Sequence, residues 1–189
     1  MSCPAVLLDR DDVININHGY VHEPENFDFI EGVFDLAQHT HEPGYKLVVI
    51  TNQAVIGHGY YSKSDFHQLT QWMCQQFAQT GTPIRQVYFS PFHPSAGLGI
   101  YLKDVFSRKP NPGMIFQAKE ELVLDLSGSI LIGDKPSDIQ TGVAVGIGRN
   151  LLFAAISPME LESVSYLKIA SLRDALPHLV RFSMGSGIQ

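Results

Sequence analysis

The sequence predicts an α/β fold in which helices cover both faces of a parallel sheet, and two observations support this prediction. Short apolar segments alternate along the chain with longer amphipathic segments, as they do in successive βαβ units. The apolar segments are continuous rather than alternating, which indicates strands that are buried on both faces. The expected architecture is a doubly wound, Rossmann-like parallel sheet.

Five segments have the length and composition of buried strands, and they occupy residues 4–9, 46–51, 85–90, 129–134 and 150–155. Helical periodicity lies between them, near residues 31–42, 62–79, 112–124 and 136–145. A sixth strand at 165–170 and a helix at 171–180 would complete the sheet. We therefore expect a single domain over residues 1–182, followed by a flexible tail at 183–189.

Composition argues against several classes of function. The net charge of -6, without any stretch rich in Lys and Arg, disfavours nucleic-acid binding. Cys3 and Cys74 are too few for a disulfide framework or a zinc knuckle. The chain also lacks a signal-peptide pattern and an apolar run of membrane-spanning length. We therefore expect a cytoplasmic protein that binds neither nucleic acid nor membrane, and we expect a monomer.

Polar side chains stand where the predicted strands end. Asp9 and Asp11 follow the first strand and share one face of an extended chain, and burying such a pair is costly unless a cation compensates. Thr51, Lys109 and Asp134 come at or after the ends of later strands. Since the carboxyl ends of parallel strands meet at one edge, acids, a hydroxyl and an amine should converge there. Phosphoryl transfer assisted by a divalent cation needs this set of groups.

These motifs, in this order, resemble those of the haloacid dehalogenase-like phosphohydrolases. That superfamily carries a DxD pair, a Thr or Ser, a Lys and a late acidic motif, here Asp9 with Asp11, Thr51, Lys109, and Asp134 with Asp138. The segments LLDRDDVIN, HGYV, VVITNQ, SRKPNPGM and IGDKPSDIQTG narrow the resemblance to the branch of D-glycero-D-manno-heptose-1,7-bisphosphate phosphatases and histidinol phosphatases. The matching segments run from residue 5 to about residue 148.

The resemblance implies a Mg²⁺-dependent phosphatase that works through an aspartyl-phosphate. It makes Asp9 the nucleophile and Asp11 the acid for the leaving oxygen, then the base for the attacking water. Thr51 and Lys109 would stabilise the transferring phosphoryl group. Mg²⁺ would bind Asp9, the Asp11 carbonyl and Asp134. No gap between the motifs is long enough for a large cap domain.

The resemblance also implies a set of substrate contacts. Arg108 matches the arginine that recognises substrate in this branch, and its planar fork suits a phosphate or a pair of hydroxyls. The loop at residues 17–20 can also be read as a polar turn, Asn52 and Gln53 as a strand-end cap, and Lys135 as a surface helix start. The residues expected to contact substrate are Asn17, His18, Gly19, Tyr20, Asn52, Gln53, Arg108 and Lys135.

Two positions depart from the pattern of the branch. Asp12 stands where glycine is usual, and it adds a negative charge close to the phosphate site. A side chain that points away would be harmless, and we do not expect this position to require a positive φ. The second departure is the loop before Arg108, where many relatives hold zinc through thiolates and an imidazole. Ser90, Phe92, Val105 and Ser107 occupy those positions, so we expect no zinc there.

The loop at residues 91–107 should be held by packing instead, and we expect it to be a specificity element or a lid. The favoured function is hydrolysis of a small phosphorylated metabolite, either a sugar bisphosphate such as D-glycero-D-manno-heptose 1,7-bisphosphate or histidinol phosphate. A catalytically weak phospholigand-binding relative is the alternative of another class. A receiver domain is disfavoured, because its phosphorylated aspartate would follow the third strand and its lysine the fifth.

Overall fold

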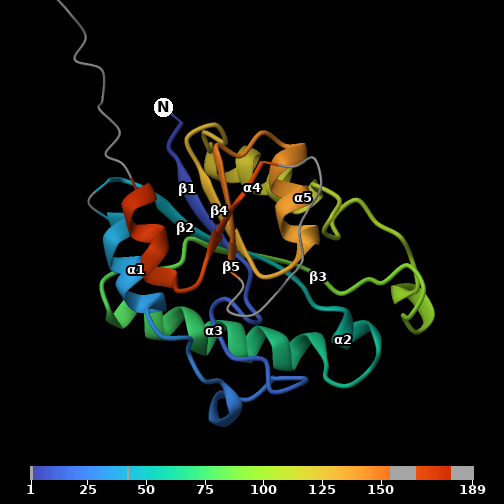
Figure 1. Ribbon diagram of the computed structural model, residues 1–189. Coiled ribbons are helices and arrows are strands. Elements are labelled where there is room, and N and C mark those ends of the chain that lie inside the picture. The colour runs from blue at the N-terminus through green and yellow to red at the C-terminus, as the bar shows by residue number, and fades with distance from the viewer. Residues whose placement is uncertain (1, 42, 154–164, 180–189) are drawn as a thin grey trace, which may run out of the picture.

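The computed structural model describes residues 2–41, 43–153 and 165–179. Six strands form one sheet in the order β3-β2-β1-β4-β5-β6, and every pairing in it is parallel. This is the doubly wound architecture expected from the sequence (Figure 1). The strands are β1 (Ala5–Leu8), β2 (Lys46–Asn52), β3 (Gln86–Ser90), β4 (Ile130–Gly133), β5 (Arg149–Phe153) and β6 (Leu167–Ile169).

Helices cover both faces of the sheet because alternate strand residues point to opposite sides. On one face, Val6 and Leu8 of β1 pack with side chains of α1 (Val33–His41) and α3 (Lys63–Gln79). On the other face, Ala5 and Leu7 of the same strand pack with α4 (Gly113–Leu122) and α5 (Pro136–Ala144). Figure 1 shows α1 and α3 separated by the sheet from α4 and α5. Burial on both sides explains why these strands read as continuous apolar runs.

The helix boundaries follow local signals in the sequence. The hydroxyl of Ser62 accepts a hydrogen bond from the amide of Asp65, and the carboxylate of Asp65 accepts one from the amide of Ser62. This capping box begins α3 at the residue after Ser62. Asp138 plays a similar part in α5, where its carboxylate accepts a hydrogen bond of 3.0 Å from the amide of Lys135.

Several predicted elements are confirmed and a few differ. The last predicted helix, at 171–180, is instead a 3-10 helix over Leu172–His178, labelled η3, and Pro177 inside it supplies no backbone N–H for an α-helical bond. Three short elements were not expected: α2 (Ala54–Gly57) and the 3-10 helices η1 (Pro24–Asn26) and η2 (Gly99–Tyr101). Residues 154–155 of the fifth predicted strand and the proposed tail at 183–189 lie outside the described residues.

The sheet order creates a crevice beside β1. The chain leaves β1 for β2 on one side, and β4 returns to pair with β1 on the other. In open α/β sheets, ligands bind at such a switch point, outside the carboxyl ends of the strands. Asp9, Gln53 and Asp134 directly follow β1, β2 and β4 at this edge. Within the part of the chain that the structure describes, no helix is long and apolar enough to cross a membrane.

Candidate active site

Asp9 lies at the centre of the polar groups that gather at this edge. It directly follows β1, and its amide donates a hydrogen bond of 3.0 Å to the carbonyl of Ile132 in the neighbouring strand. Its side chain is buried, with Oδ1 accepting a 2.7 Å bond from the amide of Arg10 and Oδ2 lying 3.0 Å from Lys109 Nζ. Burial is the main cause that raises the pKa of Asp9 to about 6, against the opposing attraction of Lys109.

Lys109 joins two of the acids. Its Nζ lies 3.0 Å from Asp9 Oδ2 and 2.6 Å from Asp138 Oδ1, and it donates a 2.9 Å hydrogen bond to the carbonyl of Ile50. These contacts use all three ammonium donors. Burial alone would lower the pKa of Lys109, but the two carboxylates raise it above its ordinary value. The lysine is therefore a fixed positive charge beside Asp9.

Asp134 and Asp138 complete an acidic cluster with Asp9. One carboxylate oxygen from each of the three residues lies within 4.8 Å of the others. The close approach depends on Gly133, because a Cβ there would lie 2.2 Å from Cβ of Asp138. Burial and the charges of Asp9 and Asp138 raise the pKa of Asp134 to about 7, although Lys135 opposes them. The three carboxylates thus repel one another in a poorly hydrated place.

The cluster fits a hard divalent cation. Oδ1 of Asp134 is buried and has no hydrogen-bond partner, so it can still act as a ligand. Mg²⁺ prefers carboxylate oxygens and keeps several waters. Of the three expected ligands, Asp9 and Asp134 lie in the cluster, and the structure adds Asp138 to them. The side chain of Asp11 is not part of it, so only the backbone carbonyl of Asp11 could serve, as the resemblance implies.

The carboxylate of Asp11 instead faces protein donors. Oδ1 accepts hydrogen bonds from Arg10 Nε at 3.1 Å and Nη2 at 2.7 Å, while Oδ2 accepts one of 2.8 Å from Gln53 Nε2. Arg10 is only 2% exposed, and burial would lower its pKa, but the charge of Asp11 holds the pKa of Arg10 above its ordinary value. Asp9 and Asp11 therefore have different surroundings although they are two residues apart.

The polar residues at the end of β2 also lie at this edge, and each forms hydrogen bonds with other protein groups. They are Thr51, Asn52 and Gln53. The buried hydroxyl of Thr51 accepts a 2.9 Å hydrogen bond from Gln53 Nε2. The amide of Asn52 forms two 3.0 Å bonds with the backbone of Lys109, one to its carbonyl and one from its N–H. Gln53 is fully buried, and its Oε1 accepts a 2.5 Å bond from the hydroxyl of Tyr61. Asn52 fixes the segment that carries Lys109, which favours the alternative reading of this position as a strand-end group.

The expected substrate loop at residues 17–20 is exposed. The amide of Gly19 donates to Asn17 Oδ1 at 3.1 Å, and His18 Nε2 lies 2.8 Å from Asp28 Oδ2. The ring of Tyr20 stacks on that of Tyr60, with ring centres 4.0 Å apart. The loop therefore presents polar groups and an exposed aromatic pair to solvent.

Two further cations follow the site residues closely in the sequence: Arg108 precedes Lys109, and Lys135 follows Asp134. Arg108 Nη1 donates a 2.8 Å hydrogen bond to the carbonyl of Phe92, and burial lowers the pKa of this guanidinium from its ordinary value. Lys135 Nζ lies 3.2 Å from Asp134 Oδ2, and its side chain is 53% exposed. The guanidinium of Arg108 is therefore turned to the loop at residues 91–107, whereas Lys135 contacts the acidic cluster and keeps an accessible ammonium.

Backbone contacts hold the loop at residues 91–107. The amide of His93 donates to the carbonyl of Tyr101, and the amide of Leu98 donates to the carbonyl of Gly57. A Cβ on Gly57 would lie 2.5 Å from the carbonyl oxygen of Pro91 and 2.9 Å from Cβ of Tyr101, so α2 and the loop are in close contact. Packing against Gly57 thus anchors this loop.

The backbone of Asp12 corrects one expectation. Its φ is 63°, in the left-handed region, so the prediction that this position would not require a positive φ is wrong. Aspartate tolerates that conformation better than most residues because its short side chain can bond locally. Asp12 Oδ1 accepts a 3.2 Å hydrogen bond from the amide of Asn17. Asp12 therefore contacts the backbone of the loop at residues 17–20, which the sequence predicts to contact substrate.

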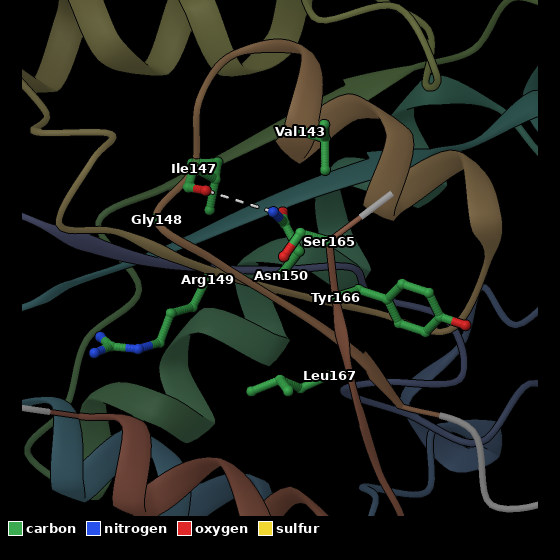
Figure 2. A pocket seen from close by; sticks show the side chains of 8 residues that line it. All are labelled: Val143, Ile147, Gly148, Arg149, Asn150, Ser165, Tyr166 and Leu167. Atoms are coloured by element: carbon green, nitrogen blue, oxygen red, sulfur yellow. Dashed lines mark hydrogen bonds between the residues drawn. The ribbon is translucent and has the colours of Figure 1, made fainter. Parts of the chain in front are cut away.

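A separate pocket of about 350 Å³ lies at the amino ends of β5 and β6 (Figure 2). It is lined by Arg149 and Leu167, which begin β5 and β6, and by Val143 near the end of α5. In Figure 2 the amide of Asn150 points to the carbonyl of Ile147, at 3.4 Å. Because the acidic cluster follows the other ends of the strands, this pocket is not part of the candidate active site.

Sequence reasoning missed two members of the site. Arg10 is the middle residue of the DxD motif, to which no role was assigned. The only indication in the sequence was that its positive charge lies between two acids. Tyr61 had no signal, since its contact with Gln53 depends on the turn after α2. Asp138 was assigned to the late acidic motif, but its place beside Asp9 and Asp134 emerges only from the structure.

Comparison with known proteins identifies the family. A family model described as polynucleotide kinase 3 phosphatase matches residues 8–146. A D-glycero-alpha-D-manno-heptose-1,7-bisphosphate 7-phosphatase from Burkholderia mallei is 46% identical over 175 residues, which is 93% of each chain. A D-glycero-beta-D-manno-heptose-1,7-bisphosphate 7-phosphatase from Vibrio cholerae is 40% identical over 183 residues, which is 96% of this chain and 98% of that one.

Solved structures agree on the fold. The D,D-heptose 1.7-bisphosphate phosphatase from B. bronchiseptica, solved with magnesium and phosphate, has a TM-score of 0.76 at 21% identity and covers 93% of this chain and 97% of that chain. The chain is a phosphoric monoester hydrolase with the fold of the haloacid dehalogenase-like phosphatases, and it belongs to the family of D-glycero-D-manno-heptose-1,7-bisphosphate 7-phosphatases.

Proposed function

We propose that this chain removes the 7-phosphate of D-glycero-D-manno-heptose 1,7-bisphosphate through an aspartyl-phosphate on Asp9. The observation that carries this proposal is the contact of Lys109 with both Asp9 and Asp138 at the sheet edge. A carboxylate held beside a buried ammonium is a nucleophile whose charge is partly balanced before an anionic phosphate arrives. The names of the two relatives from Burkholderia mallei and Vibrio cholerae support the choice of substrate.

The first step forms a bond from an Asp9 oxygen to phosphorus. The bond from phosphorus to the sugar oxygen breaks, its electron pair stays on that oxygen, and the Asp11 carboxyl supplies the proton that makes it an alcohol. In the second step, water attacks the phosphorus of the aspartyl-phosphate and Asp11 takes the water's proton. Phosphate leaves, and both carboxyl groups return to their starting states. Thr51 and Lys109 stabilise the phosphoryl oxygens in both steps.

The acidic cluster supplies the metal side of the same chemistry. Asp9, Asp134 and Asp138 would hold Mg²⁺, with the carbonyl of Asp11 as a further oxygen ligand. When bound, the cation neutralises charge and lets the anionic carboxylate approach an anionic phosphate. We assign two cationic side chains to the substrate, Lys135 beside Asp134 and Arg108 beside the loop at residues 91–107, together with the polar loop at residues 17–20.

A panel of phosphate esters tests the substrate. We expect Mg²⁺-dependent phosphate release to be fastest with heptose 1,7-bisphosphate, and assays of the separate alpha and beta anomers decide the preferred configuration. Phosphate release at least as fast from histidinol phosphate would overturn the assignment. Tight binding of the bisphosphate without turnover would favour a phospholigand-binding protein instead.

A further inference from the structure

We propose that Arg10, Gln53 and Tyr61 are positioning residues that hold the carboxylate of Asp11 in the orientation needed for proton transfer. This inference rests on the proposed function, in which Asp11 protonates the leaving oxygen. It changes the expected part of Gln53 from substrate contact to support of Asp11, and it gives Arg10 and Tyr61 a function that the motifs did not suggest.

The two oxygens of Asp11 are occupied to different degrees. Oδ1 accepts two hydrogen bonds from Arg10, at 2.7 and 3.1 Å, and a longer one of 3.4 Å from Asn15. Oδ2 accepts a single bond, from Gln53 at 2.8 Å. Each carboxylate oxygen has about two lone-pair sites, so Oδ1 is saturated and Oδ2 keeps acceptor capacity. The side chain is 16% exposed, and we infer that Oδ2 is the oxygen that carries the transferred proton.

Gln53 is committed to this network on every side. Both hydrogens of Nε2 are used, one toward Asp11 Oδ2 and one toward Thr51 Oγ1 at 2.9 Å, and Oε1 accepts the hydroxyl of Tyr61. If the amide of Gln53 were flipped, its oxygen would face the carboxylate of Asp11, which is repulsive. The hydroxyl of Tyr61 would then lose its acceptor, so both contacts favour the orientation described. Because the side chain is fully buried, no polar atom of Gln53 is left for substrate.

Arg10 anchors the other side of Asp11. Its guanidinium lies 5.8 Å from the centre of the Phe66 ring, and Nη2 reaches the carbonyl of Val21 at 3.4 Å. An arginine with 2% exposure requires a counter-charge, and Asp11 supplies it at 2.7 Å. The same ion pair therefore compensates the charge of Arg10 and restrains the side chain of Asp11.

The network also connects Asp11 with the expected substrate loop. Val21 directly follows residues 17–20, and the ring of His22 stacks on Tyr61 with centres 5.4 Å apart. Tyr61 itself packs with Ile56 and Phe66 in a small apolar cluster. The position of the proton-carrying oxygen thus depends on the same side chains that fix one end of the loop.

A positioning function makes a specific prediction about leaving groups. Phenyl phosphate and 4-nitrophenyl phosphate have the same ring, but nitrophenolate leaves readily without a proton and phenolate does not. Misplacing a general acid should therefore slow the first substrate much more than the second. A residue that only stabilises the fold would affect both substrates equally.

The experiment compares kcat/KM for the two esters in Tyr61→Phe, Gln53→Leu and Tyr88→Phe, because kcat/KM reports the step in which the ester bond breaks. Tyr88→Phe is the matched control, since it deletes a hydroxyl that donates a 2.7 Å bond to Glu121 on the α4 side of the sheet. We expect Tyr61→Phe and Gln53→Leu to lower kcat/KM for phenyl phosphate by about tenfold and for 4-nitrophenyl phosphate by less than about threefold. Tyr88→Phe should change neither.

Equal losses on both esters, or no loss on either, would overturn the positioning network. A thermal unfolding scan of each variant shows whether it is folded at the assay temperature. A folding defect lowers the rates on both esters in parallel, so it cannot produce the selective loss on phenyl phosphate that we expect. Failure of the proposed function has another signature: the unmutated protein would release no phosphate from heptose bisphosphate or from either aryl ester.

Discussion

Lys109 Nζ lies 3.0 Å from Asp9 Oδ2, and both side chains are buried at the edge of the sheet where β1 ends. The same ammonium lies 2.6 Å from Asp138 Oδ1. A single positive charge therefore compensates two of the three carboxylates in the cluster. This ion pair links the packing of the site to its chemistry, because it holds the proposed nucleophile and balances its charge.

Lys109→Met should abolish most activity. Removal of the ammonium leaves Asp9 and Asp138 without their cation, so we expect kcat to fall by about 10²–10³-fold. The free energy of unfolding should fall by about 3–5 kcal/mol, as for other buried pairs that lose one partner. Steady-state assays and denaturant titrations measure the two effects. Lys119→Met, on the exposed side of α4, is the control. If Lys109→Met kept a kcat within tenfold of the unmutated value, that result would contradict this role of Lys109.

Asp134→Asn should stabilise the metal-free protein at neutral pH. The pKa of Asp134 is raised from 3.8 to about 7, chiefly by burial and by Asp9, so the folded state keeps a proton that the unfolded state releases. The stability that this group contributes is greatest below pH 3.8 and is lost as pH rises toward about 7. Without divalent metal, the Tm of Asp134→Asn should exceed that of the unmutated protein near pH 7.5, and the difference should shrink toward pH 4.

Added Mg²⁺ should reverse the order of the two proteins. The unmutated cluster gains stability from bound cation, whereas Asp134→Asn has lost a ligand. Thermal scans with and without Mg²⁺ at several pH values provide the measurement. A Mg²⁺-induced rise in Tm of the same size in both proteins would show that Asp134 does not contribute to the metal site.

Asp12→Gly should keep phosphatase activity. Glycine adopts φ of 63° without strain, and the carboxylate of Asp12 faces the Asn17 amide. Asp12→Ala should be less stable than Asp12→Gly by about 1 kcal/mol, because alanine in the left-handed region is strained. Chemical denaturation compares the two variants. A large loss of kcat in Asp12→Gly would instead indicate that this acid participates in catalysis.

Zinc should be substoichiometric in the purified protein. Ser90, Phe92, Val105 and Ser107 supply neither thiolate nor imidazole, and Gly57 packs closely against the loop backbone. Elemental analysis after dialysis gives the metal content, and a zinc-selective chelator should leave Tm unchanged. One zinc ion per chain would contradict this prediction.

The sequence predicted the sheet and the residues at its edge because both depend on local patterns. Continuous apolar runs identify buried strands, and parallel strands must bring Asp9, Thr51 and Asp134 to the same side. The type of η3 was predicted wrongly, and α2 was not expected, since short helices carry little periodicity. The positive φ of Asp12 was missed because only the fold of residues 9–17 imposes it.

The directions of side chains could not be predicted from motif positions. Asn52 and Gln53 follow a strand at the correct edge, yet their amides bind Lys109 and Asp11. Arg10 bonds to its sequence neighbour Asp11, whereas Gln53, 42 residues away, reaches Asp11 only through tertiary packing, and Tyr61 joins this network through Gln53. A motif gives the edge at which a residue lies, whereas tertiary packing decides which group it contacts.

The measurement that tests the central claim most directly is phosphate release from heptose 1,7-bisphosphate by the unmutated protein and by Asp9→Asn, both in Mg²⁺. We predict that the unmutated protein turns over and that Asp9→Asn, which keeps the shape of the side chain but loses the nucleophilic carboxylate, releases no phosphate. Sustained turnover by Asp9→Asn at a rate near that of the unmutated protein would contradict the account.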